Sequence, residues 1–222
     1  MSENTSSGGL NRRRFVQAGG AFLFAAQCPV TFSRKAHAAG AGSMMNSFVR
    51  IDPNNVITLL ANNSEFGNGA YTVMSMMLAE ELDVDYRSIA LEAAPTTPEY
   101  YSPLFREYLT AGSVTTGSTF MPMRTAGAKA RAMLLQAASR DWQVPTDELG
   151  THGGHVTHAG SGRSSTYGEL LETIHRLDIQ PPETVTLKDP SEFAILGKPA
   201  RRYEGAGKVD GTAQFGIDIK LP

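Results

Sequence analysis

Cysteine is almost absent from this chain. The 222 residues include one cysteine, Cys28, and it lies within the first 38 residues, which we expect to be removed on export. The remaining chain therefore forms no disulfide within itself and offers no thiolate to a zinc site or an iron–sulfur cluster. Any cofactor held by this chain has to be bound by backbone amides, hydroxyls, side-chain amides or carboxylates.

An excess of basic charge and long apolar runs are lacking as well. The chain has 20 lysines and arginines against 22 aspartates and glutamates and shows no basic stripe, which argues against a nucleic-acid partner. Gly19, Gly20, Gln27 and Pro29 interrupt the apolar stretch at 18–32. That stretch is also shorter than the ~20 residues that a membrane-spanning helix needs, so a membrane anchor is not expected.

The first 38 residues have the pattern of a twin-arginine export signal. Arg12-Arg13 precedes the apolar stretch, and Ala36-His37-Ala38 forms a small-x-small cleavage pattern. The alternatives are a general secretory signal, which is normally more apolar, and a lipoprotein signal at Cys28, for which the preceding Gln27 is large. The twin-arginine route carries folded proteins, so it indicates that a cofactor is assembled before export to the periplasm.

The first half of the remaining chain predicts an α/β module. The β-rich runs at 48–51 and 56–60 flank turn residues at 52–55, which predicts a hairpin. Strong helix formers with buried-type residues predict a helix over 71–82, and the alternation at 89–93 is typical of a strand. Together these elements indicate a helix-packed mixed sheet of the α+β class.

The second half predicts further helices with less regular chain between them. A long helix that runs to about Trp142 is expected, with Pro122 near its start, where a proline is tolerated. The residues 153–158 suggest a short strand and a turn. Another helix is expected to run to about His175, capped by Thr166 or Ser165, with Glu169 placed for a capping box.

We expect five parts along the chain. They are a signal peptide, a spacer, the α/β module, an extended linker and the start of a truncated second domain, at residues 1–38, 39–46, 47–178, 179–204 and 205–222. The alternating residues 215–221 predict the first strand of that second domain.

Two glycine-containing loops, each before an expected helix, carry the candidate cofactor-binding residues. In the first loop, Gly67, Asn68 and Gly69 precede the helix that starts near Tyr71. Glycines let a backbone approach a ligand closely, a helix start presents free amides, and Asn68 both donates and accepts hydrogen bonds. The alternative interpretation of this loop is an ordinary Asn-Gly turn before a helix.

The second loop is rich in hydroxyls. Its candidate residues are Ser113, Thr116, Gly117, Ser118 and Thr119. Amides combined with hydroxyls at a helix start suit a phosphate or pyrophosphate without a P-loop lysine. The alternative is a Ser/Thr N-cap. Two such loops in one module favour a shared phosphate-bearing ligand more than either loop does alone.

Other polar residues give weaker signals. His152, His155 and His158 recur at three-residue spacing, but they lie among glycines in an expected turn without a nearby carboxylate pair, which disfavours a metal site. Glu80 and Glu81 are adjacent near the end of a helix and are expected at the surface or in packing rather than in paired-carboxylate catalysis.

Several of these segments resemble the molybdopterin-binding subunit of the xanthine dehydrogenase/aldehyde oxidase family. The similarity is greatest to its exported branch, which includes isoquinoline 1-oxidoreductase β subunits and acetic-acid-bacterial aldehyde dehydrogenase large subunits. Residues 64–72 are similar to the family's E-x-G-Q-G-x-x-T loop, and 79–85 match its AEELDVD stretch. Residues 115–119 and 124–128 resemble the segment that holds the pterin dinucleotide, and 208–213 resemble the opening of a hammerhead-type domain.

The resemblance implies a molybdenum hydroxylase that oxidises an aldehyde or an N-heterocycle with water as oxygen donor. The implied cofactor is molybdopterin, in its cytosine dinucleotide form, with molybdenum. The implied partners are an iron–sulfur small subunit, a cytochrome c subunit and the remaining molybdopterin-binding domains. The catalytic glutamate is expected in later domains, so none of Glu65, Glu80 and Glu81 is assigned as the base.

Asn68 departs from the family pattern, since the family has Gln at this position. The side-chain amide is kept but is one methylene shorter. Two rival interpretations remain at this stage. One is an inactive truncated or split-gene product that binds at most a partner subunit, and the other is a small periplasmic protein that binds a phosphate-bearing ligand.

Overall fold

The structure is a computed structural model that describes residues 42–221. The predicted export signal lies outside the described residues. The strands are β1 (Ser43–Asn46), β2 (Val49–Ile51), β3 (Ile57–Ala61), β4 (Ala90–Ala93), β5 (Leu149–His152), β6 (His155–His158) and β7 (Arg163–Thr166). The helices are α2 (Ala70–Leu82), α3 (Thr115–Trp142), α4 (Leu170–Arg176) and α5 (Gly205–Asp210), with 3-10 turns η1 (Tyr86–Ser88), η2 (Pro98–Tyr100), η3 (Thr146–Glu148), η4 (Pro190–Glu192) and η5 (Gly216–Asp218).

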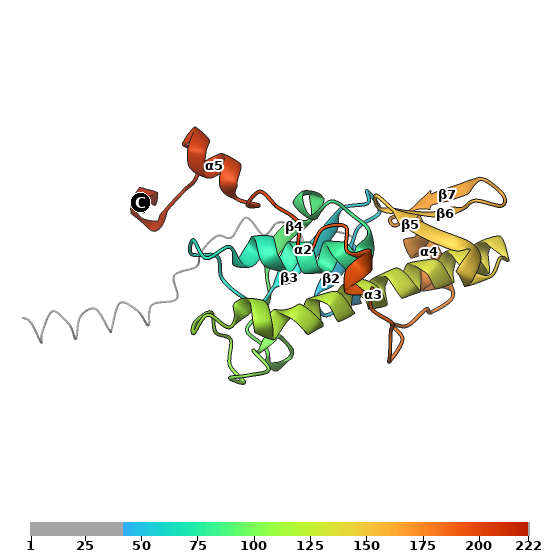
Figure 1. The fold of residues 1–222 in the computed structure, drawn as a ribbon, viewed down its shortest axis with the longest axis horizontal. Coiled ribbons are helices and arrows are strands. Elements are labelled where there is room, and N and C mark those ends of the chain that lie inside the picture. The colour runs from blue at the N-terminus through green and yellow to red at the C-terminus, as the bar shows by residue number, and fades with distance from the viewer. Residues whose placement is uncertain (1–41, 222) are drawn as a thin grey trace, which may run out of the picture. The chain divides into compact units, whose positions relative to one another are not determined.

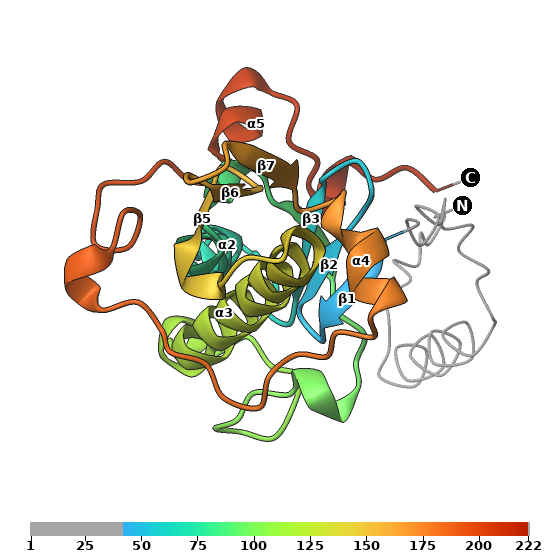
Figure 2. The ribbon, with the colours of Figure 1, turned by 90° about the vertical axis from the view of Figure 1, so that its right-hand side faces the viewer.

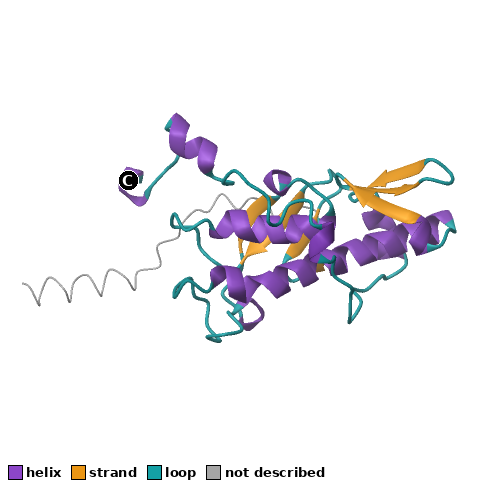
Figure 3. Ribbon diagram, in the orientation of Figure 1, coloured by secondary structure: helices purple, strands orange, loops and turns teal. Residues whose placement is uncertain are grey.

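The predicted hairpin forms the centre of a four-stranded mixed sheet. Strands β2 and β3 pair antiparallel, with Val49 opposite Leu59, as the turn residues between them predict. Strand β3 pairs on its other side with β4, in parallel, with Leu59 opposite Leu91. All five residues of β3 are buried, as expected for a central strand covered on both faces. The predicted helix-packed mixed sheet is therefore confirmed (Figure 3).

One edge of this sheet was not expected. Residues 43–46, assigned to the spacer, form the antiparallel edge strand β1, with Ser43 opposite Ile51 and Met45 buried. The local composition carries little strand preference here. The free edge of β2 decides the conformation, because pairing satisfies backbone groups that would otherwise stay open.

Helices α2 and α3 lie side by side on one face of the sheet (Figures 1 and 2). The chain order is β3, α2, β4, α3, so α2 is the crossover that joins the two parallel strands. The helices approach each other closely at Gly127, where a Cβ atom would lie 2.7 Å from the carbonyl oxygen of Leu78. Since each helix follows one of the parallel strands, both helices begin at the carboxyl edge of the sheet.

Helix α3 begins earlier than predicted, although its end at Trp142 is as expected. It starts at Thr115, and Pro122 lies inside it. The Ser/Thr run was expected to lie before this helix. Here the hydroxyls of Ser118 and Thr119 donate to the carbonyl oxygen of Thr115, over 3.4 and 2.7 Å, so the helix accommodates them.

The region after α3 is more regular than predicted. In place of one short strand, β5, β6 and β7 form a three-stranded antiparallel sheet. The capping-box contacts predicted for Glu169 are present, since the amides of Thr166 and Glu169 each donate to the other side chain. The buried hydroxyl of Tyr167 donates to the carbonyl oxygen of Leu82 over 2.6 Å and so joins this region to α2.

The chain from 179 to 204 runs across α2 and α3 without a strand and with one 3-10 turn, η4. It is fastened by two buried carboxylates of α2. Glu80 accepts hydrogen bonds from the amides of 194–196, and Glu81 accepts one from the amide of Lys188. These glutamates were expected at the surface or in packing. They are buried and bind the segment at 188–196 to α2.

The predicted strand at 215–221 is not formed in this structure. The 3-10 turn η5 lies at 216–218, and the alternating apolar side chains Phe215, Ile217, Ile219 and Leu221 are exposed. An alternating pattern becomes a strand when an edge pairs with it, and no such edge lies beside it within the described residues. None of the helices in 42–221 combines the length and apolar character that a bilayer crossing requires.

Candidate functional site

The two predicted loops meet at the carboxyl edge of the parallel strands β3 and β4. In α/β sheets this edge, with its helix starts, is where ligands typically bind. Asn63, two residues after the end of β3, donates from Nδ2 to the carbonyl oxygen of Leu109 over 2.9 Å. The amide of Ser64 donates to Oγ1 of Thr110 over 2.8 Å. These contacts tie the loop before α2 to the loop before α3.

A tyrosine completes this junction. The hydroxyl of Tyr108 donates to the carbonyl oxygen of Ala61, at the end of β3, over 3.2 Å. Burial raises the pKa of Tyr108, with a smaller contribution from nearby Tyr71. The hydroxyl therefore keeps its proton, and the donor that closes the end of the strand is retained at neutral pH.

In the first loop, the amides that were predicted to face a ligand are already paired. Oε1 of Glu65 accepts hydrogen bonds from the amides of Gly67 and Gly69, over 2.7 and 3.1 Å. Its Oε2 accepts one from the amide of Tyr71 over 3.3 Å. Gly67 and Gly69 have φ values of 103° and 83°, which glycine adopts readily and other residues rarely do. The loop thus folds around its own carboxylate.

Asn68 is the exposed side chain at the tip of this loop. Its Oδ1 accepts a hydrogen bond from the amide of Ala70 over 3.1 Å, which is an Asx-type turn at the start of α2. Its Nδ2 has no protein acceptor within 42–221, so this donor is available to a ligand. The asparagine side chain is short enough to bond to the backbone amide two residues ahead.

The start of α3 is open, in contrast to the start of α2. Val114 is the N-cap residue, and no side chain caps the helix. The amides of Thr115, Thr116 and Gly117 belong to the first helical turn, where amides have no partner inside the helix. Across the part of the chain that the structure describes, no acceptor meets them. This helix start offers free donors together with the favourable end of a helix dipole.

A surface cavity of about 520 Å³ lies against this helix start. Its lining residues are Pro103, Leu104, Ser113, Val114, Gly117 and Ser118. Three of them, Ser113, Gly117 and Ser118, were predicted from the sequence, and Thr116 is exposed on the same first turn. Thr119 does not belong to this surface, because it is buried with its hydroxyl against Thr115 and Met77.

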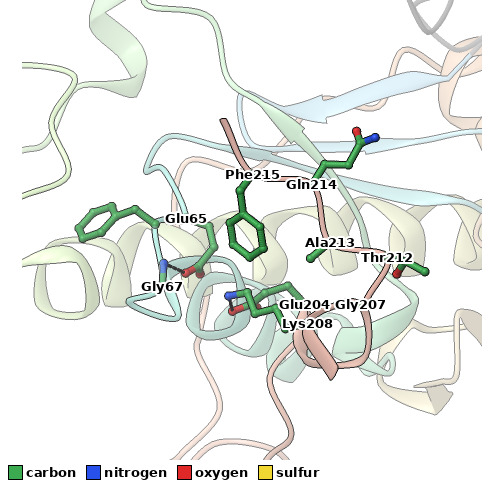
Figure 4. A pocket seen from close by; sticks show the side chains of 10 residues that line it. Glu65, Gly67, Glu204, Gly207, Lys208, Thr212, Ala213, Gln214 and Phe215 are labelled. Atoms are coloured by element: carbon green, nitrogen blue, oxygen red, sulfur yellow. Dashed lines mark hydrogen bonds and ion pairs between the residues drawn. The ribbon is translucent and has the colours of Figure 1, made fainter. Parts of the chain in front are cut away.

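A second cavity, of about 660 Å³, lies beside the first loop (Figure 4). One wall is formed by 65–67 and the other by Glu204 and residues 207–208 and 212–215. In the view of Figure 4 the ring of Phe215 lies beside Glu65, and Lys208 lies below both. The predicted residues are therefore distributed over two neighbouring surfaces, with Gly67 on this one.

The free donors at the start of α3 and on Asn68 fit a pterin that carries phosphate groups. They are neutral backbone amides, hydroxyls and one side-chain amide, none of which needs to lose a proton, and free amides at a helix start suit an anion. The predicted histidines lie elsewhere, with His158 bonded to Glu148 and Ser161. No three His, Cys, Asp or Glu side chains of 42–221 cluster as metal ligands would.

Sequence reasoning missed two residues that organise the site. Asn63 and Arg202 make their contacts with residues 46 and 137 positions away, respectively. For Asn63 a signal was present, since two asparagines directly follow a buried strand. For Arg202 there was no such signal, because no motif around it indicates a contact with the loop at 64–69.

Comparisons with known proteins show which proteins this chain is similar to. The β subunit of isoquinoline 1-oxidoreductase from Brevundimonas diminuta is 32% identical over 255 aligned residues, which cover 96% of this chain and 32% of the relative. The membrane-bound aldehyde dehydrogenase of Gluconacetobacter polyoxogenes is 25% identical over 175 residues, covering 77% of this chain and 22% of the relative. The chain thus spans about a third of the first of these relatives and less of the second.

A solved structure is similar over part of the chain. Quinoline 2-oxidoreductase from Pseudomonas putida 86 aligns with a TM-score of 0.45 and 19% identity, over 62% of this chain and 17% of that one. The sequence match is far more extensive, since residues 16–219 match the family described as the molybdopterin cofactor-binding domain. The chain therefore belongs to the molybdopterin cofactor-binding domain family.

Proposed function

We propose that this chain is the molybdopterin-binding part of a molybdenum hydroxylase that oxidises an aldehyde or an N-heterocycle. The observation that carries the proposal is the uncapped start of α3, whose first amides are free and border a cavity lined by Ser113, Gly117 and Ser118. An anionic group gains both hydrogen bonds and the helix dipole at such a position.

The two loops would divide the cofactor between them. The start of α3 suits its phosphates, and in the dinucleotide form this region would hold the pyrophosphate. Asn68 retains one free amide donor and suits the pterin ring or a ligand of the metal. When bound, the cofactor would supply the molybdenum at which substrate is oxidised with water as oxygen donor, and this chain's residues would bind and orient it.

We further propose partners that take up the electrons. After the predicted signal the chain has no cysteine, so an iron–sulfur cluster would be carried by a separate small subunit, with a cytochrome c subunit as the next acceptor. The twin arginines at 12–13 support export of the loaded protein to the periplasm, where it would reach a membrane through a partner.

The proposal is tested by measuring molybdenum and pterin in the purified chain, expressed in a host that makes the dinucleotide cofactor. We expect both to co-purify with the wild-type chain in comparable amounts. Absence of both, in a chain that is folded by circular dichroism, would exclude this function.

A charge substitution separates loss of binding from loss of folding. Thr116→Asp places a carboxylate in the first turn of α3, where it stabilises the helix by ~0.5 kcal/mol but repels a phosphate. We expect cofactor content to fall while the free energy of unfolding is unchanged or higher. Ser164→Asp, at an exposed position in β7, is the matched control and should leave the cofactor content as in wild type.

A further inference from the structure

The carboxylate of Glu65 occupies the inside of the first loop. The side chain is only 8% exposed, and it accepts hydrogen bonds from three amides of the loop and the first turn of α2. Hydrogen bonds to an ionised acceptor are stronger than those between neutral groups. The start of α2 is therefore closed by an internal anion, whereas the start of α3 is open.

One cation balances this carboxylate. Nη2 of Arg202 lies 3.2 Å from Oε1 of Glu65 and also pairs with Oε1 of Glu204. Arg202 belongs to the chain segment that leads into α5. Its guanidinium thus links the loop at 64–69 to a segment 137 residues further along the chain.

The segment around Arg202 is itself fixed to α2. The amide of Tyr203 donates to Oγ1 of Thr72 over 2.9 Å, and the hydroxyl of Thr72 donates to Oε2 of Glu204 over 3.3 Å. The hydroxyl of Tyr203 donates to the carbonyl oxygen of Ile89 over 2.8 Å. The backbone next to Arg202 is therefore held at a defined place beside the loop, and the Arg202 side chain, 44% exposed, reaches Glu65 from there.

We propose that Glu65 and Arg202 are positioning residues, which hold the loop at 64–69 in the conformation that presents Asn68. Asn68 lies between Gly67 and Gly69, whose positive φ angles few other residue types adopt. Without the carboxylate, these glycines would sample many conformations, and the amide of Asn68 would lose its fixed place. That Asn68 contacts the cofactor rests on the proposed function, whereas the fixing of the loop does not.

Amide hydrogen exchange of the metal-free chain tests the proposal directly. In Glu65→Gln one acceptor oxygen becomes an amide group and the charge is lost. We expect exchange of the amides of Gly67, Gly69 and Tyr71 to accelerate by about tenfold or more, while β3 exchanges as in wild type. Arg202→Met should accelerate the same amides by a smaller factor, and Arg202→Lys should restore part of the protection.

The matched controls are Glu172→Gln and Arg201→Met. Glu172 is exposed on α4, and Arg201 neighbours Arg202 while its side chain makes no ion pair within the described residues. Neither control should change exchange in the loop. The proposal is overturned if Glu65→Gln leaves loop exchange within about twofold of wild type, or if β3 accelerates by the same factor, which would indicate general destabilisation.

Measurement of the molybdenum content of the same variants is the second part of the test. If the wild-type chain binds the cofactor, Glu65→Gln and Arg202→Met should lower its content, with Arg202→Lys in between. If the wild-type chain binds none, the proposed function fails, while the exchange of the loop still decides whether Glu65 and Arg202 position it.

Discussion

The guanidinium of Arg124 lies 2.7 Å from the carboxylate of Glu81, and their side chains are only 6% and 0% exposed. Arg124 also donates to the carbonyl oxygen of Lys188 over 2.6 Å and lies between the rings of Phe120 and Phe193. This pair joins α3 to α2 and to the chain that crosses them. Glu81 is the second glutamate of the AEELDVD stretch, so a motif that resembles the family's is structural here.

We expect Arg124→Met to destabilise the protein by ~3–5 kcal/mol, because it leaves the carboxylate of Glu81 buried without its closest cation. Urea unfolding followed by circular dichroism measures the change. The double variant Arg124→Met/Glu81→Met should be more stable than Arg124→Met alone, since it removes the unpaired charge. An exposed pair is the control: Arg176→Met breaks the pair with Asp141 and should cost less than ~1 kcal/mol.

The contact of α2 with α3 predicts an unusual response to alanine at Gly127. Helix propensity alone would favour Gly127→Ala by ~1 kcal/mol. The new methyl group would lie 2.7 Å from the carbonyl oxygen of Leu78 and 3.0 Å from Cβ of Glu81, so the helices would have to move apart. We expect a net loss of ~1–3 kcal/mol in the free energy of unfolding.

Gly117 is the matched control on the same helix. A Cβ atom at Gly117 would meet no atom within 4 Å, so Gly117→Ala should raise the free energy of unfolding or leave it unchanged. Opposite signs for the two alanine variants are the expected result of urea unfolding. If Gly127→Ala were stabilising as well, the close approach of α2 and α3 would be contradicted.

The sequence predicted elements whose signals are local. The hairpin was marked by turn residues between β-rich runs, α2 by its helix formers, and the candidate binding loops by glycines before helix starts. The strand β1 and the parallel pairing of β3 with β4 depend on edges supplied by distant segments. The role of Glu80 and Glu81 was equally hidden, because their partners lie 43 to 116 residues away.

Within the site, the sequence indicated where donors gather but not which of them are free. The amides of Gly67 and Gly69 are paired with Glu65, two and four residues away, and this depends on the direction its side chain takes. Thr119 was grouped with the second loop because the start of α3 was expected later. Once the helix begins at Thr115, the same residue faces the interior.

The predicted export signal leads to a test that is independent of the fold. Arg12→Lys/Arg13→Lys keeps the charge but removes the paired arginines that the twin-arginine route reads. We expect the double variant to accumulate in the cytoplasm in folded form, as shown by cell fractionation and immunoblotting. Arg14→Lys is the control and should be exported as wild type. Equal export of the double variant would favour the general secretory route.

We expect the contacts of Glu204 with Arg202 and Lys208, beside the first loop, to depend on pH. Burial by itself would raise the pKa of Glu204, but the hydrogen bonds from its own backbone amide and from Lys208, with the positive charge of Arg202, lower the pKa overall. A lowered folded-state pKa means that the stabilisation is present above the ordinary value of 4.5 and is lost as the pH falls through the folded-state value. Protonation would weaken the contacts of Glu204 with Arg202 and Lys208.

We therefore expect the amide of Tyr203 to exchange more slowly in the wild-type chain than in Glu204→Gln at pH values above 4.5, where the glutamate is ionised. Below this value the difference between the two proteins should shrink and then vanish, because the protonated glutamate resembles the glutamine. Comparing both proteins at each pH cancels the intrinsic pH dependence of exchange. Glu183→Gln, an exposed substitution in the same segment, should match wild type throughout, and a difference for Glu204→Gln that grows on acidification would refute the assigned direction.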